Sequence, residues 1–123
     1  MFEITIQRSF TATHALRLSD GSREPIHSHD WQLKVTVGSD QLDSIDTVMD
    51  FHDLEAIVER VIQPFQNTDL GQVTPFAEGQ LNPSAERLSQ WLGTQIAGFL
   101  PNHTRLNHVE VEEAPGCTAL YRP

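Results

Sequence analysis

The chain has 123 residues, which allows one domain with a buried core, predicted to span residues 1–123. Its net charge of −9 argues against nucleic-acid binding, because phosphate neutralisation needs clustered cations and Lys34 is the only lysine. No apolar run is long enough to span a bilayer, and the lone Cys117 cannot form an internal disulfide, so we expect a cytoplasmic protein without a membrane partner.

Two strands are predicted in the first third of the chain. The first runs from Phe2 towards His14, because apolar and polar residues alternate from its start. A surface loop over residues 16–25 follows and contains an Asp-Gly-Ser turn sequence. The second strand begins at a pair of histidines and ends near Gly38. Its apolar residues occupy every second position: Trp31, Leu33, Val35 and Val37.

Two amphipathic helices are predicted next. Asp50 is expected to cap the first, which ends near Pro64. Its apolar residues recur at spacings of three and four: Phe51, Leu54, Val58 and Val61. After a loop over residues 66–80, Asn82-Pro83 is expected to open the second helix, with the proline in its first turn. The predicted buried stripe of this helix consists of Ala85, Leu88, Leu92, Ile96 and Phe99.

Two more strands, over residues 106–113 and 117–121, are predicted on either side of a Pro-Gly turn. The order is therefore strand, strand, helix, helix, strand, strand. Hairpins at both ends favour an α+β domain, in which an antiparallel four-stranded sheet carries two helices on one face. Small domains often cover the exposed edges of such a sheet by oligomerising.

Three histidines form the most informative pattern in the chain. His27 and His29 project from the same side of a strand, and His14, on the other predicted strand, can supply a third imidazole. Three neutral imidazoles without a cysteine suit zinc and leave a fourth position open, as a catalytic site requires. The alternative is that His-x-His on a strand is an ordinary polar pair. A purely structural zinc module is a further alternative, which the open fourth position disfavours.

Five short motifs occur in order along nearly the whole chain. They are Phe10-x-Ala12-x-His14, His27-x-His29-Asp30-Trp31, Val48-Met49-Asp50-Phe51-x-x-Leu54, Pro83-Ser84-Ala85-Glu86 and Val109-x-Val111-x-Glu113, with Tyr121 near the end. Together they resemble the 6-pyruvoyl tetrahydropterin synthase and 6-carboxytetrahydropterin synthase family. The resemblance implies the tunnelling fold, a ββααββ subunit usually assembled as a dimer of trimers. It also implies sites between subunits that bind dihydroneopterin triphosphate.

The resemblance also implies roles for individual residues. Zinc is carried onto the three histidines, where it would polarise side-chain oxygens of the substrate. Glu113 matches the acid that anchors the pterin ring, since a carboxylate can accept two parallel hydrogen bonds from that edge of a pterin. Ser84 and Glu86 match the helix-start motif and are expected to bind substrate. The alternatives are a solvated strand residue for Glu113 and ordinary first-turn residues for Ser84 and Glu86.

The chain departs from the family pattern at the usual catalytic cysteine, where Arg23 stands. Glu24 follows, three residues before His27, and this resembles the subgroup in which a glutamate replaces the cysteine. In that subgroup the side chain of dihydroneopterin triphosphate is cleaved to give 6-hydroxymethyl-dihydropterin. A carboxylate beside a zinc-bound diol can remove and return a proton if burial brings its pKa towards neutrality. The alternative for Glu24 is a surface loop residue.

A second departure concerns the family's Asp–His pair, which aligns with Gln66-Asn67, and Asp69 is the nearest possible substitute. Two functions therefore remain open. One is a zinc-dependent pterin lyase with Glu24 as general acid or base. The other is a zinc-containing pterin-binding homologue with little or no turnover. Arg17 and Arg23 are the candidates for contacting a triphosphate, and the remaining histidines are expected to be structural: His52, His103 and His108.

Overall fold

Five strands and two α-helices are present in the computed structural model, which describes residues 1–123. In chain order they are β1 (Phe2–His14), β2 (His27–Ser39), α1 (Phe51–Ile62), β3 (Thr68–Asp69), α2 (Ala85–Ala97), β4 (Arg105–Ala114) and β5 (Cys117–Tyr121). Three single-turn 3₁₀ helices lie between α1 and α2, at Gln63–Phe65, Leu70–Gln72 and Phe76–Glu78.

The four long strands form the antiparallel arrangement that the alternation predicts. β2 pairs with β1 on one side and β4 on the other, and β5 forms a hairpin with β4. The sheet also has a fifth strand, so the predicted count of four is one too low. β3 runs parallel to the end of β1 through the pairs Ala12–Thr68 and Thr13–Asp69. Two residues are too few to show a periodicity, so this strand falls within the predicted loop.

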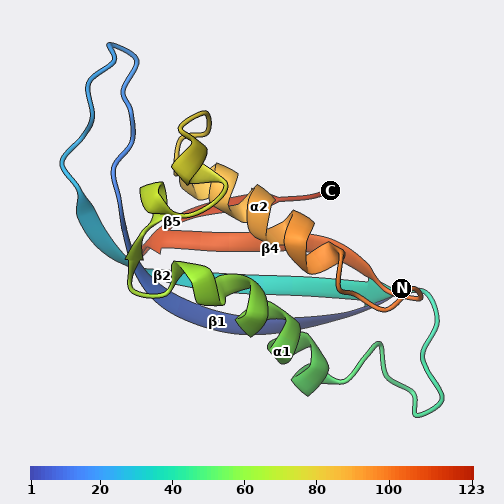
Figure 1. Cartoon of the computed structure of the whole chain (residues 1–123). Coiled ribbons are helices and arrows are strands. Elements are labelled where there is room, and N and C mark those ends of the chain that lie inside the picture. Colours follow the sequence, from blue (N-terminus) through green and yellow to red (C-terminus); the bar gives the residue numbers. More distant parts are fainter.

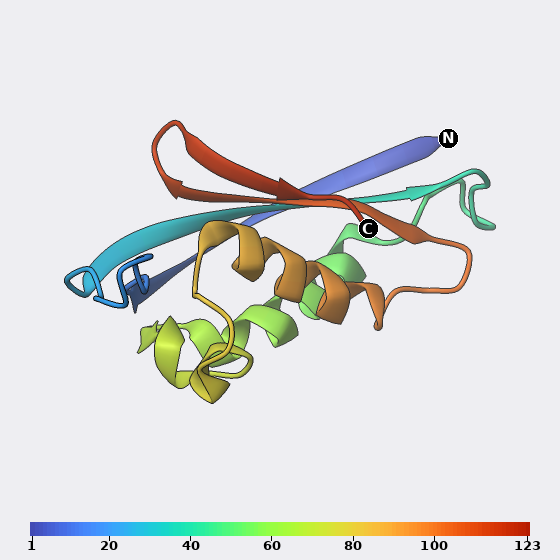
Figure 2. The same cartoon turned by 90° about the horizontal axis from the view of Figure 1, so that it is seen from above.

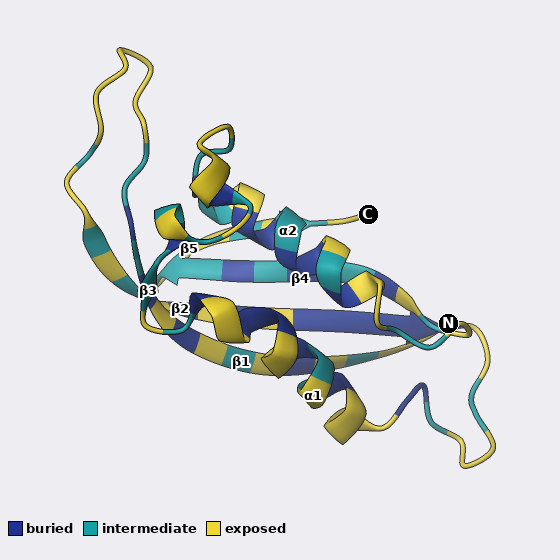
Figure 3. Cartoon of the chain, in the orientation of Figure 1, coloured by how far each residue is buried: buried dark blue, intermediate teal, exposed yellow.

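Both helices pack against one face of the sheet, and the other face has no covering layer (Figures 1 and 2). The period-two alternation of β2 explains this division, because Gln32 and Lys34 point to the open face while their neighbours are buried. Figure 3 shows the buried band between sheet and helices. Its β2 residues are at most 1% exposed: Trp31, Leu33, Val35 and Val37. Each such side chain contributes about 1.5–3 kcal/mol to stability on burial.

The helix starts are set by side-chain caps. The Asp50 carboxylate accepts the His52 backbone N–H at 2.7 Å, as predicted, and the helix follows directly. The cap of α2 is Ser84, whose Oγ accepts the Arg87 backbone N–H at 3.2 Å. The prediction that Pro83 lies in the first turn of α2 is therefore wrong, because Pro83 precedes the cap.

Phe99 was expected in the buried stripe of α2, and this is also incorrect. The helix ends at Ala97, and Phe99 is 44% exposed. Its ring lies beneath the Arg60 guanidinium, whose carbon is 4.5 Å from the ring centroid. A cation over an aromatic face is favourable at the surface, and this contact covers part of the ring without placing it in the core.

No helix of this structure has the length and apolar character needed to cross a membrane.

The hairpin of β1 and β2 ends in a long loop that projects beyond the sheet (Figure 1). The end of β1 and the start of β2 lie at the base of this loop. His14 is the last residue of β1, and His27 and His29 lie among the first residues of β2, so the three histidines are at one end of the sheet.

Candidate metal and substrate site

The strand register brings the three histidine rings together. His14 pairs with His27 across β1 and β2, and His29 pairs with Ala12 on the same face. The ring centroids are 4.6 Å apart for His14 and His27, 5.1 Å for His14 and His29, and 4.8 Å for His27 and His29. One ligand nitrogen from each ring lies within 4.8 Å of the other two, so the cluster could hold a metal ion.

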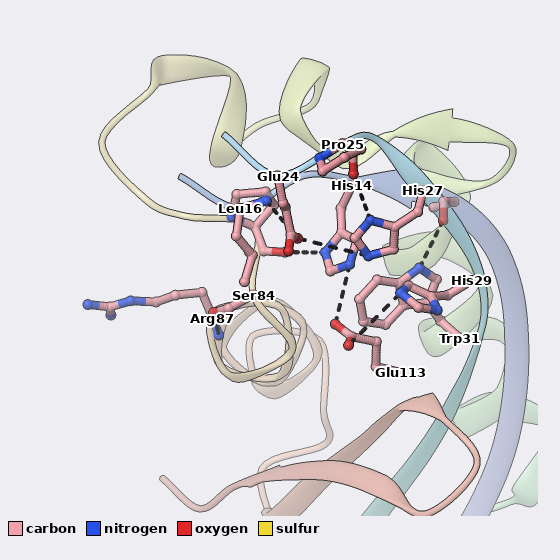
Figure 4. Close-up of polar contacts among 12 residues, drawn as sticks. His14, Leu16, Glu24, Pro25, His27, His29, Trp31, Ser84, Arg87 and Glu113 are labelled. Atoms are coloured by element: carbon pink, nitrogen blue, oxygen red, sulfur yellow. Dashed lines mark hydrogen bonds and ion pairs between the residues drawn. The ribbon is translucent and has the colours of Figure 1, made fainter. Parts of the chain in front are cut away.

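Backbone carbonyls orient two of these rings. His14 Nδ1 is 2.8 Å from the carbonyl oxygen of Pro83, and His27 Nδ1 is 2.8 Å from that of Pro25 (Figure 4). A carbonyl oxygen can only accept a hydrogen bond, so each Nδ1 carries the proton and each neutral ring has its lone pair on Nε2. This is how metal-binding histidines are usually held, with the other ring nitrogen bonded to a carbonyl or carboxylate.

Two buried nitrogens in the cluster lack a hydrogen-bond partner: His14 Nε2 and His29 Nε2. Leaving a buried polar atom unpaired costs about 1–3 kcal/mol, so such atoms in a folded protein need an explanation. A cation held between the three Nε2 atoms would explain why these nitrogens lack a hydrogen-bond partner. Burial lowers the pKa of His29, and the neighbouring His14 and His27 act in the same direction against the opposing effect of Glu113. Burial therefore favours the neutral ring, which is the form that binds metal.

Two carboxylates lie beside the rings, one from a strand and one from the loop. Glu113 in β4 has Oε1 at 3.4 Å from His14 Nε2 and Oε2 at 3.9 Å from His29 Nε2. Glu24 in the loop has Oε1 at 3.9 Å from His27 Nε2. Sequence reasoning left both open as surface residues. The structure places both carboxylates against the cluster, with side chains about one third exposed or less.

Glu24 is held in position by the loop itself. Its Oε1 accepts the Leu16 backbone N–H at 2.9 Å, and its own backbone N–H donates to the Leu16 carbonyl at 3.0 Å. A further bridge joins Arg17 and Arg23. These contacts close the base of the loop, so the carboxylate faces the histidines and does not extend into solvent (Figure 4).

A pocket of about 360 Å³ brings together the three residues predicted to bind substrate, Ser84, Glu86 and Glu113. Its volume lies at the low end of the range for small-molecule sites. Cys117 also lines it, at the start of β5. Ser84 has a structural role as well, because its hydroxyl caps α2.

Residues at and near the position of the Asp–His pair take part in the fold. The Asn67 backbone N–H donates to the Thr11 carbonyl at 2.7 Å, and the Asp69 carboxylate accepts the Gly71 N–H at 3.0 Å. Arg17 donates to the carbonyl oxygens of Gly79 and Gln80, so it joins two loops, and the residue is exposed. Its expected contact with a triphosphate stays a prediction.

The other histidines lie outside the cluster. His103 Nε2 is 2.8 Å from the Val48 carbonyl oxygen, His52 is exposed beside Glu55, and His108 lies on the open face of the sheet opposite Thr36. Sequence reasoning missed the orienting carbonyls of Pro83 and Pro25. Every residue carries such a group, so the sequence offers no signal for it.

Comparison with known proteins identifies the family of the chain. The family model described as 6-pyruvoyl tetrahydropterin synthase matches residues 3–123. A 6-carboxy-5,6,7,8-tetrahydropterin synthase of Haemophilus influenzae is 32% identical over 122 residues, covering 89% of this chain and 85% of the relative. A dihydroneopterin monophosphate aldolase of Pyrococcus furiosus is 26% identical over 110 residues, covering 89% of this chain and 88% of that protein.

Solved structures share the fold. The 6-pyruvoyl tetrahydropterin synthase of Caenorhabditis elegans superimposes with a TM-score of 0.81 at 21% identity, over 100% of this chain and 97% of that one. The Plasmodium vivax 6-pyruvoyltetrahydropterin synthase gives a TM-score of 0.77 at 17% identity, over 99% and 97% of the two chains. At these identities the likeness concerns the fold alone.

Proposed function

The chain belongs to the 6-pyruvoyl tetrahydropterin synthase family, and we propose that it is a zinc-dependent lyase that cleaves the side chain of dihydroneopterin triphosphate to give 6-hydroxymethyl-dihydropterin. One observation supports this most strongly. The Glu24 carboxylate lies 3.9 Å from His27 Nε2, beside three imidazoles that converge on one point. The name of the Pyrococcus furiosus relative, an aldolase acting on dihydroneopterin monophosphate, supports a carbon–carbon cleavage.

Zinc fits the residues present. His14, His27 and His29 would hold it through Nε2, because hydrogen bonds to carbonyls occupy Nδ1 of His14 and His27. Three nitrogen ligands without a thiolate suit zinc and leave a position for substrate. When bound, the ion polarises side-chain oxygens of the substrate and makes their hydroxyl protons more acidic.

Glu24 is the proposed general base and acid. It removes the proton of the substrate 2′-hydroxyl, and the bond between C1′ and C2′ breaks as C2′ becomes an aldehyde. The electron pair of that bond passes into the pterin ring, and Glu24 returns the proton to C1′. The products are 6-hydroxymethyl-dihydropterin and a glycolaldehyde that carries the triphosphate. The Leu16 N–H holds the carboxylate in place for both transfers.

Glu113 is the proposed anchor of the pterin ring. It lines the same pocket as Ser84 and Glu86, and its carboxylate is 31% exposed, so a ligand can reach it. A carboxylate presents two acceptor oxygens to the adjacent amino and ring N–H groups of a pterin. This would orient the ring so that its side chain extends towards the histidines.

The second candidate function is a zinc-containing pterin-binding protein with little or no turnover. It is favoured because Gln66 and Asn67 stand in place of the Asp–His pair, and because the carboxylate of Asp69, the nearest possible substitute, accepts the Gly71 N–H. Neither Gln66 nor Asn67 can carry a proton near neutral pH. The two functions differ only in whether substrate is converted, so a product assay separates them.

The experiment incubates zinc-loaded protein with dihydroneopterin triphosphate and identifies products by chromatography and mass spectrometry. The lyase predicts 6-hydroxymethyl-dihydropterin from the wild-type protein, its loss in Glu24→Gln and its retention in Glu112→Gln. Glu112 is a suitable control because it lies on the open face of the sheet. Binding without product would favour the second function, and absence of both binding and product would overturn both.

We also propose a homo-oligomer, a dimer of trimers with sites between subunits. The free edges of the sheet support this proposal. β1 pairs with β3 only at Ala12 and Thr13, so most of its outer edge has no partner strand. β5 forms the opposite edge. Strands of a second copy could pair with both edges. Light scattering would test this, with six times the chain mass expected and a monomer contradicting it.

A further inference from the structure

The Glu113 carboxylate lies against the histidine cluster, and this contact is unfavourable for a carboxylate and neutral imidazoles alone. Its two oxygens are 3.4 and 3.9 Å from Nε2 of His14 and His29. In the neutral form of His14, which binds metal, the proton is on Nδ1 because Nδ1 bonds to the Pro83 carbonyl, so Nε2 presents a lone pair. A carboxylate oxygen then faces a nitrogen lone pair, and both are acceptors. This contact becomes favourable when a cation lies between them.

The distances suit shared coordination. Zinc bonds nitrogen and carboxylate oxygen at about 2.0–2.2 Å, so two ligand atoms of one tetrahedral ion are about 3.3–3.5 Å apart. The 3.4 Å between Glu113 Oε1 and His14 Nε2 matches that separation. The other carboxylate oxygen, Oε2, is 3.9 Å from His29 Nε2. The Glu113 carboxylate therefore lies within reach of a metal ion held by these two rings.

The other nearby carboxylate is engaged differently. Glu24 Oε1 accepts the Leu16 N–H and is 3.9 Å from a single imidazole nitrogen, that of His27. The Glu113 carboxylate accepts no hydrogen bond from the protein and contacts two of the three rings (Figure 4). Of the two carboxylates, that of Glu113 has its oxygens free to bind a cation.

We propose that Glu113 is the fourth protein ligand of the metal when no substrate is bound, and that it leaves the metal to bind the pterin. The second half rests on the proposed function, whereas the first half does not. One carboxylate would then close the metal site in the resting protein and open it when a pterin arrives. The metal and the pterin would compete for the same carboxylate oxygens. Binding of the pterin to Glu113 would therefore weaken its bond to the metal, and binding of the metal would weaken its bond to the pterin.

The test uses the whole protein with Glu113→Gln and a control, Glu112→Gln. Both variants change the charge by the same amount, and Glu112 lies on the other face of β4. Zinc affinity is measured by competition with a chelator, and the coordination of Co²⁺ by its visible absorption. We expect zinc affinity to fall about 10- to 100-fold or more in Glu113→Gln, as loss of even an outer-shell partner costs that much. We expect an altered cobalt spectrum in this variant and wild-type behaviour in the control.

A second readout adds pterin, which has no side-chain hydroxyls that could bind the metal, to the cobalt-loaded proteins. The wild-type spectrum should change as Glu113 leaves the metal, and the Glu113→Gln spectrum should stay constant. Metal-free Glu113→Gln should unfold at no lower temperature than wild type, because a glutamine amide can donate to the unpaired Nε2. This controls for misfolding.

The outcomes separate the inference from the proposed function. Equal zinc affinity and equal cobalt spectra in the two variants would overturn the inference, even if Glu113→Gln weakens pterin binding. A loss of zinc affinity in Glu113→Gln alone supports the fourth-ligand role, even if no 6-hydroxymethyl-dihydropterin is formed by wild type. A pterin-induced spectral change that persists in Glu113→Gln would overturn the exchange step.

Discussion

His14 Nδ1 donates a hydrogen bond of 2.8 Å to the carbonyl oxygen of Pro83, which joins the end of β1 to the residue before the cap of α2. The start of α2 thereby sets the orientation of a ring that is 1% exposed. The proposed metal site therefore depends on the helix layer as well as on the two strands that carry its histidines.

Loss of the α2 cap should weaken both the fold and metal binding. Ser84→Ala removes the hydroxyl that accepts the Arg87 N–H, and such a loss costs about 0.5–2 kcal/mol. Because Pro83 adjoins the cap, we also expect lower zinc affinity. Urea unfolding and chelator competition measure the two effects. Ser44→Ala, in an exposed loop, is the control, and equal behaviour of both variants would contradict this prediction.

Replacement of His29 by alanine should remove tight metal binding, because two imidazoles remain of three. The matched control is His52→Ala, whose side chain is 90% exposed on α1 and outside the cluster. Isothermal titration with Zn²⁺ compares the variants. A zinc affinity in His29→Ala within a few-fold of the control would be inconsistent with coordination by the cluster.

Removal of the metal should abolish activity and leave the fold intact. The large core between sheet and helices includes none of the three histidines, so we expect the fold to form without the ion. After dialysis against a chelator we expect native far-ultraviolet circular dichroism, no product formation and recovery on adding Zn²⁺. Unfolding on chelation would instead favour a structural metal module.

The contact between Arg8 and Glu55 should make stability depend on pH. The hydrogen bond from Arg8 lowers the pKa of Glu55 and joins β1 to α1. Because the pKa of Glu55 is lower in the folded state, its charged carboxylate stabilises the protein at pH values above the ordinary glutamate pKa of about 4.3. This stabilisation is lost once the pH falls below the folded-state pKa. Glu55→Gln should therefore be less stable than wild type at pH 7, with the difference disappearing as the pH falls through the lowered pKa. Urea unfolding at pH 7 and pH 3 measures this, and a difference that does not shrink between the two pH values would exclude the ion pair as its source.

Much of the fold could be predicted because its long elements repeat a local pattern. Alternation along β2 predicts its buried face, and Asp50 predicts the start of α1. The exceptions are elements that carry little pattern of their own. β3 has two residues, and Phe99 continues the spacing of α2 although the helix ends before it.

The sequence by itself determined that His27 and His29 share one side of a strand, because successive side chains of a strand alternate. It could not determine that Pro83 orients His14 or that Glu113 lies 3.4 Å from His14 Nε2. Those contacts join residues far apart in the chain. Only the pairing of β4 with β2, and the approach of the segment before α2 to the end of β1, bring them together.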